Sequence, residues 1–298
     1  MNIKNVLVPV DFSPPSRLAV DHAVSLAREF QGRLTLLHVV ESVPAFADSF
    51  RIETAGIQKE QEEQALRMLS ALLGAEDQDD LDLRVVIKSG DIKGEICEAI
   101  REAKADIVVM GTHGRGLFGR LFIGSITEGI LRKVSIPVLT ICHVVQPREF
   151  KRILFATDLS GGSEQAFDFA LEFARTVHSD LLILHAIHNM SSAYEGVETL
   201  PDVNEYGVDE AKARLATFRA HADRSKIKAE TIVVEDVPAD AILKAADEQV
   251  PDLILIAVQK KGLVERALLG TTAERVVREA KVPVLCVPVG VATGQEQV

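Results

Sequence analysis

The sequence contains two copies of one pattern, each close to half of the chain in length. Asp11, at the end of an apolar run, has its counterpart in Asp158, 147 positions later, and Gly124 has its counterpart in Gly270, 146 positions later. Solenoid repeats have periods of roughly 20–50 residues, so a period this long indicates a duplicated domain instead. We predict domains at residues 1–145 and 150–290, followed by a frayed polar tail at 291–298.

Each copy alternates short apolar runs with longer amphipathic ones. In the first copy, residues 34–40 are almost all apolar, whereas Ala19, Ala23 and Leu26 recur at the spacing of one helix face. Near-continuous apolar strands separated by helices predict a parallel sheet covered on both faces. Right-handed crossovers then give a doubly wound α/β domain. The expected strands of the first copy lie at residues 4–11, 34–40, 83–88, 106–110 and 138–142.

The composition is that of an ordinary globular protein. Of the 298 residues, 47% are hydrophobic and 26% are charged, and the formal net charge of −11 argues against nonspecific binding to nucleic acid or anionic membranes. The sequence has no signal-type segment and no apolar run of the ~18 residues that a membrane span needs. Three widely spaced cysteines suggest buried thiols in a reducing compartment. We expect a cytoplasmic protein whose partners include neither nucleic acid nor membrane.

A glycine-rich segment at residues 111–125 separates an apolar, strand-like run from a helix-like run. Such a segment brings backbone amides close to a ligand, and the following helix directs its first N–H groups and its positive dipole end at an anion. We expect Gly111 and Gly114 to allow close backbone approach, and Gly124 and Ser125 to hold phosphates at the helix start. The alternative is an ordinary flexible connection.

Other strand ends should meet this segment. In an open parallel sheet, ligands bind beyond the carboxyl ends of the strands, where the strand order reverses. Asp11, Val39 and Met110 each end an expected strand. Asp11 can bond ribose hydroxyls or a base amine, or share a metal with the phosphates, and its alternative role is helix capping. Val39 offers backbone groups and an apolar wall. We interpret His38 as a satisfied buried histidine, with metal ligation as the alternative.

The pattern Gly-x2-Gly-x9-Gly-Ser at residues 111–125 resembles the ATP-binding signature of the universal stress protein family. The opening Val8-Pro-Val-Asp-Phe-Ser, the Leu-His-Val at 37–39 and the Ile136-Pro-Val-Leu extend this resemblance, and the repeat extends it to the whole chain. The resemblance implies a tandem universal stress protein with two Rossmann-like domains of the adenine nucleotide alpha hydrolase type. It also implies, for each domain, a five-stranded parallel sheet of order 3-2-1-4-5 with helices on both faces.

The resemblance also implies a ligand. ATP, or AMP or ADP, would bind at the positions that match the family motif, with Mg²⁺ reaching Asp11 through the nucleotide. His113 would contact phosphate, and the alternative is that it lies in the loop without touching it. The matching positions are Pro9, Asp11, Val39, Met110, Gly111, His113, Gly114, Gly124, Ser125 and Ile126.

The second copy departs from this pattern. Ala257 stands at the position of Gly111 and Lys260 at the position of Gly114, while only Gly270 and the threonine after it persist. Side chains would then stand where the backbone approaches the ligand. We therefore predict one competent site, in the first domain, and a structural role for the second. Family members dimerise through the last strand, which implies that the two domains pair within the chain as a pseudo-dimer and leaves open a homodimer.

Three functions fit these observations. The leading hypothesis is an ATP-binding regulatory or stress-response protein whose nucleotide occupancy alters its shape or its choice of partner. The second is slow ATP hydrolysis, since positioning and charge stabilisation carry phosphoryl transfer. For that reaction His113 and Asp11 are the candidates to orient water, and we assign no catalytic residue. The third is a protein-interaction module without nucleotide turnover.

Overall fold

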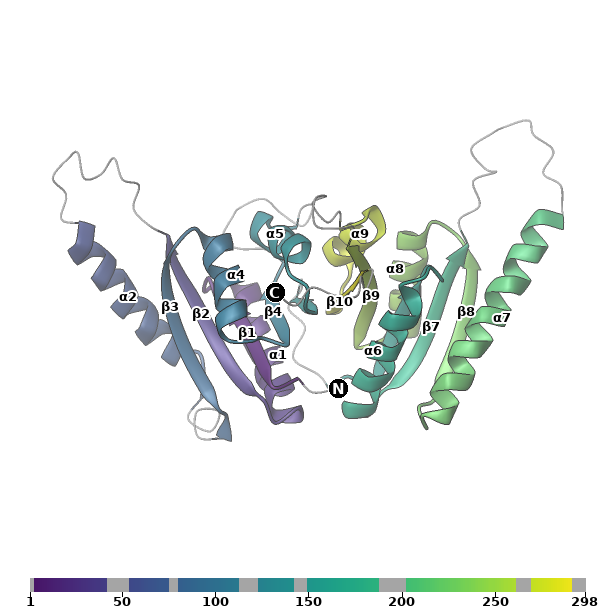
Figure 1. Cartoon of the computed structure of the whole chain (residues 1–298), viewed down its shortest axis with the longest axis horizontal. Helices are drawn as coiled ribbons and strands as arrows, with labels where there is room; N and C mark the ends of the chain where they lie inside the picture. Colours follow the sequence, from purple (N-terminus) through teal and green to yellow (C-terminus); the bar gives the residue numbers. More distant parts are fainter. Residues whose placement is uncertain are drawn as a thin grey trace, which may run out of the picture. The chain divides into compact units, whose positions relative to one another are not determined.

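The structure of the protein is a computed structural model. It describes residues 3–41, 54–74, 80–112, 123–141, 149–187, 202–260 and 269–290. The chain divides into two compact units, Asn2–Arg148 and Glu149–Val298 (Figure 1). We refer to them as the first and the second half. No helix in the described ranges is both long enough and apolar enough to cross a membrane.

The first half is a parallel sheet with helices on both faces. Its strand order is β3-β2-β1-β4-β5, which is the predicted 3-2-1-4-5 order. Right-handed crossovers place α1 and α2 on one face and α4 and α5 on the other (Figure 1). The elements are β1 (Asn5–Pro9), α1 (Pro14–Glu29), β2 (Arg33–Glu41), α2 (Thr54–Ser70), β3 (Leu83–Gly90), α4 (Ile92–Glu102), β4 (Ile107–Gly111), α5 (Ser125–Lys133) and β5 (Val138–Ile141).

The second half repeats this architecture. Its strands run in the order β8-β7-β6-β9-β10, which is again 3-2-1-4-5, so the doubly wound α/β prediction is confirmed for both halves. The pairing of the two halves through their last strands stays a prediction. The elements are β6 (Arg152–Thr157), α6 (Ser163–Thr176), β7 (Asp180–Ile187), α7 (Asp202–Arg224), β8 (Ala229–Glu235), α8 (Pro238–Gln249), β9 (Leu253–Lys260), α9 (Thr271–Glu279) and β10 (Val284–Gly290).

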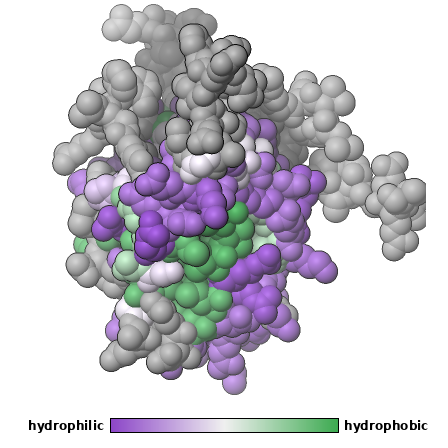
Figure 2. Space-filling model, turned by 90° about the vertical axis from the view of Figure 1, so that its left-hand side faces the viewer, coloured by the Kyte–Doolittle hydropathy of each residue, from purple (hydrophilic) through white to green (hydrophobic). Residues whose placement is uncertain are grey.

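The central strands of the first half are buried on both faces. Val6, Leu7 and Val8 of β1 have no exposed surface, which explains their continuous apolar sequence. The edge of the sheet is different. Figure 2 views the side of the first half that carries α2 and β3, and it shows a contiguous apolar area bordered by hydrophilic residues. Strand β3 is mostly half-buried, and Leu66 of α2 is 48% exposed.

Candidate functional site

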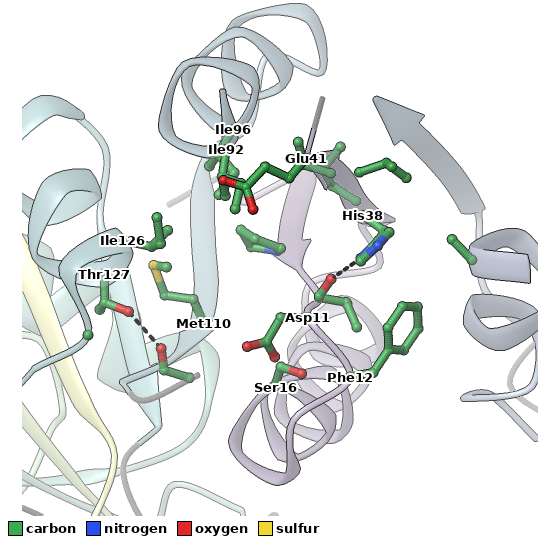
Figure 3. A pocket seen from close by; sticks show the side chains of 18 of the residues that line it. Asp11, Phe12, Ser16, His38, Glu41, Ile92, Ile96, Met110, Ile126 and Thr127 are labelled. Carbon is green, nitrogen blue, oxygen red and sulfur yellow. Dashed lines mark hydrogen bonds between the residues drawn. The ribbon is translucent and has the colours of Figure 1, made fainter. Parts of the chain in front are cut away.

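A cavity of about 1150 Å³ lies at the carboxyl ends of β1, β2 and β4, next to α2 and the starts of α4 and α5 (Figure 3). The parallel topology brings these strand ends to one edge of the sheet. The strand order reverses at β1, since β2 and β3 lie on one side of it and β4 and β5 on the other. His113 and Gly114 lie outside the described residues. All other predicted site residues line the cavity, namely Pro9, Asp11, Val39, Met110, Gly111, Gly124, Ser125 and Ile126.

The cavity also has walls that the sequence motifs do not reveal. The residues from α2 recur at i, i+3, i+4 and i+7, so one helix face forms that wall, and this spacing is the only sequence signal for it. These walls are formed by Gln61, Gln64, Ala65 and Met68 from α2, Ile92 and Ile96 from α4, and Glu41 from the end of β2.

The turn between β1 and α1 places Asp11 at the cavity. Strand β1 ends at Pro9, two residues before the predicted end, because the chain turns through Phe12, whose φ of 63° is left-handed. The carboxylate of Asp11 accepts hydrogen bonds from Ser13 N (2.9 Å) and Ser13 Oγ (2.6 Å). Ser13 is itself the N-cap of α1 and accepts from Ser16 N. Asp11 therefore stabilises the turn before the helix, and Ser13 does the capping.

His38 ties the end of β2 to the same turn. Its Nδ1 lies 2.6 Å from the carbonyl oxygen of Val10, and its ring packs against Phe12 at a centroid distance of 4.7 Å (Figure 3). A carbonyl only accepts, so Nδ1 carries the proton. No group of three histidine, cysteine or acidic side chains is placed to hold a metal ion within the described residues. The hydrogen bond satisfies Nδ1 of this half-buried ring, and the choice between a satisfied histidine and a metal ligand stays a prediction.

Strand β2 runs past the end of β1 and turns backbone groups into the cavity. The register ends with Pro9 opposite Leu37, while β2 continues to Glu41 alongside β3. Arg33 N donates to the carbonyl of Lys4 and Leu37 O accepts from Val10 N, so odd-numbered β2 residues direct both backbone groups toward β1. Val39 is the next odd residue. Its N–H and C=O therefore point past the last described ladder pair, into the cavity that Val39 lines.

Hydrogen bonds fix the start of α5 beside the end of β4. Gly124 N donates to the carbonyl of Thr112 (2.7 Å), and Thr127 Oγ1 donates to the carbonyl of Gly111 (2.8 Å; Figure 3). Gly124 is the N-cap, and no side chain among the described residues caps the helix there. The first-turn N–H groups and the positive end of the helix dipole thus meet the cavity at Ser125 and Ile126, an arrangement that suits an anion.

The packing of β4 gives a reason for glycine at position 111 that the sequence did not suggest. A Cβ at this position would lie 2.8 Å from Pro15 Cβ and 2.9 Å from the Pro15 carbonyl carbon, at the start of α1. Glycine is therefore favoured by packing of β4 against α1, and the expectation that it also serves ligand approach stays a prediction. At the corresponding positions the second half has Ala257 and Gly162. A Cβ at Gly162 would meet Val289, at 2.7 Å from its Cγ2, so the neighbours of this position differ between the two halves.

A family model, described as the universal stress protein family, matches residues 2–141 and again 149–288. These two matches cover nearly all of the chain. The chain belongs to the universal stress protein family. Both halves are universal stress protein domains, and the resemblance stated from the sequence motifs is confirmed.

Relatives of this universal stress protein share the tandem arrangement. A universal stress protein of Mycolicibacterium smegmatis is 27% identical over 290 residues, covering 95% of this chain and 96% of the relative. One of Mycobacterium tuberculosis is 25% identical over 288 residues, covering 94% and 95%. A crystal structure of a universal stress protein from Archaeoglobus fulgidus superposes with a TM-score of 0.74 at 21% identity, covering 97% and 99%. This last likeness concerns the fold alone.

The second half of this universal stress protein keeps the turn after its first strand and adds side-chain hydrogen bonds to it. Asp158 accepts from Ser160 N and from Ser163 Oγ, both at 2.9 Å. Burial raises the pKa of Asp158, but these hydrogen bonds outweigh it and hold that pKa below its usual value. Arg214 of α7 donates to the carbonyl of Leu159 (2.5 Å). Gln259 at the end of β9 donates to Ser160 Oγ (2.9 Å).

Arg214 and Gln259 can be compared with their counterparts in the first half. With the offset of 146, Arg214 corresponds to Met68, which lines the cavity of the first half, and Gln259 corresponds to His113. Leu159 corresponds to Phe12, and both have a left-handed φ. In the second half, two side chains therefore hydrogen-bond to the turn after β6 from positions that correspond to Met68 and His113.

Proposed function

We propose that this universal stress protein binds one adenine nucleotide, in the cavity of the first half, and that nucleotide occupancy regulates its shape or its choice of partner. One observation carries the proposal. Residues from three strand ends and the start of α5, expected from the sequence and from the family resemblance, line a single cavity. The family resemblance implies ATP, or AMP or ADP, as the ligand.

The backbone of Val39 supports adenine as the base. Adenine presents an acceptor, N1, beside a donor, the N6 amine, and a strand-edge N–H and C=O complement that pair. Guanine presents the opposite order, an acceptor at O6 and a donor at N1. Because the matching groups of Val39 belong to a strand paired to β3, they are held in place before the ligand arrives. Apolar side chains of Ile92, Ile96 and Met110 supply walls for a flat ring (Figure 3).

The other end of the cavity supports the phosphates. Gly124, Ser125 and Ile126 bring uncapped first-turn N–H groups of α5 to the cavity. Asp11 lies where it can bond a ribose hydroxyl, or reach Mg²⁺ held by the phosphates (Figure 3). Restriction of binding to the first half is supported by Arg214 and Gln259, which bridge the corresponding region of the second half.

Direct measurement of bound nucleotide tests the proposal. We expect isothermal titration of the nucleotide-free full chain with ATP and Mg²⁺ to give one equivalent per chain, with GTP at least about tenfold weaker because one donor and one acceptor are mismatched. Thermal unfolding should shift upward with ATP. A chain that binds neither nucleotide, or binds two equivalents, contradicts the proposal. A phosphate-release assay on the same sample separates a stable switch from slow hydrolysis.

A further inference from the structure

The cavity of the first half has acidic side chains but no basic one among the described residues that line it. Asp11 and Glu41 carry carboxylates, and His38 donates to a backbone carbonyl. The start of α5 offers a partial positive charge to a phosphate, equivalent to about half an elementary charge. A chain of phosphates carries several negative charges, so a cation close to the start of α5 would be needed for balance.

Lys93 is placed to be that cation. It lies in the first turn of α4, beside Ile92, which lines the cavity, and it is half-buried. Its side chain lies across Gly129 of α5, where an added Cβ would be 3.0 Å from Lys93 Cδ and 3.5 Å from Lys93 Nζ. Gly129 follows Ser125 by four residues, about 6 Å along the helix axis. The ammonium group is therefore held about one helical turn from the phosphate end of the cavity.

The second half places its cation from the opposite helix. The position of Lys93 is taken there by Ala239, and the position of Gly129 by Arg275 of α9. Each half thus has one long cationic side chain and one small residue at the corresponding positions of a helix pair, α4 and α5 in the first half and α8 and α9 in the second. The absence of a side chain at Gly129 leaves the space across which Lys93 lies.

The two cations differ in their partners. Arg275 donates to both carboxylate oxygens of Asp240 and to Glu279. The hydrogen bond from Arg275 lowers the pKa of Asp240. At the positions of these two acids the first half has Gly94 and Lys133. Lys93 accordingly makes no ion pair with any described residue. The positive charge that the second half neutralises internally is retained in the first half.

We propose that Lys93 is a specificity-determining residue that reads the phosphate chain of the ligand, so that affinity rises with phosphate number. This inference rests on the proposed function and names the part of the nucleotide that the charge recognises. The ammonium group, held against α5, extends to the β- and γ-phosphates as a mobile point charge. The Mg²⁺-bound and the free nucleotide both retain net negative charge for it to contact.

Titration of the full chain with adenosine, AMP and ATP tests this role. We expect Lys93→Gln to weaken ATP binding about tenfold, the effect of losing one charge-assisted contact, and to change adenosine binding less than about twofold. Lys93→Arg should retain most of the ATP affinity. Lys133→Gln is the matched control, because it removes the same charge from an exposed position on α5, two turns from the helix start.

The outcomes separate the two proposals. Wild-type protein that binds neither adenosine nor ATP overturns the proposed function, and the role of Lys93 with it. Wild-type protein that binds ATP while Lys93→Gln binds it equally well overturns the role of Lys93 alone. An equal loss for adenosine and ATP also overturns it, since that pattern reports a packing defect between α4 and α5.

Discussion

Replacing Gly111 by alanine should destabilise the first half by about 1–3 kcal/mol, the usual cost of an added methyl group in a packed site. The new Cβ would lie 2.8 Å from Pro15 Cβ and 2.9 Å from the Pro15 carbonyl carbon. Carbon atoms in contact prefer ~3.5–4.0 Å, so the start of α1 would have to move by roughly 0.7 Å. Differential scanning calorimetry should show a melting temperature lower by about 2–4 °C per kcal/mol.

A double-mutant cycle with Pro15→Gly tests this contact. The second change removes Pro15 Cβ, but the Pro15 carbonyl carbon and Ser16 N would still lie 2.9 and 3.1 Å from the new methyl group. We expect the double variant to recover part of the loss, with a coupling energy of about 0.5–3 kcal/mol. The cycle also corrects for the entropic cost of removing a proline, about 0.4–1 kcal/mol. If Gly111→Ala keeps wild-type stability but loses ATP binding, the packing explanation is wrong and this glycine serves the ligand.

Three further results are expected. Met68→Arg should lower ATP affinity at least about tenfold in a titration, because the guanidinium would bridge the cavity as Arg214 bridges the second half, whereas Met68→Leu should leave affinity unchanged. The pKa of Asp158 is lower in the folded state than its ordinary value of 3.8, so the ionised carboxylate stabilises the fold above pH 3.8. This contribution disappears as the pH falls through the folded-state pKa. The difference in urea unfolding free energy between wild type and Asp158→Asn should therefore be larger at pH 6 than at pH 3. Burial raises the pKa of Cys286 to about 12, so a thiol reagent should label it only after unfolding. Rapid modification of Cys286 itself in the native protein, located by peptide mass spectrometry, would contradict its buried position.

The doubly wound class and the strand ends that line the cavity followed from the sequence, because both depend on topology, whereas the strand order came from the family resemblance. Once alternating strands and helices define a doubly wound sheet, the residues after β1, β2 and β4 must share one edge. That argument placed Asp11, Val39 and Met110 together without any knowledge of side-chain contacts.

Contacts that helices make could not be predicted from strand topology. The wall formed by Met68 depends on how α2 lies against β2, which its helical periodicity does not specify. The contact of Lys93 with Gly129 depends on the packing of α4 against α5. The close approach of Gly111 to Pro15 requires the position of α1, which the glycine motif does not specify.

The length difference between β1 and β2 has a consequence for mutagenesis. Val39 contributes to the cavity through its peptide groups, which every residue except proline possesses, and the second half accordingly has alanine at this position. In the proposed binding mode only the peptide groups of Val39 contact the base, so an alanine substitution there should leave base recognition intact. Sequence divergence at this position would then carry no information about whether the ligand is retained.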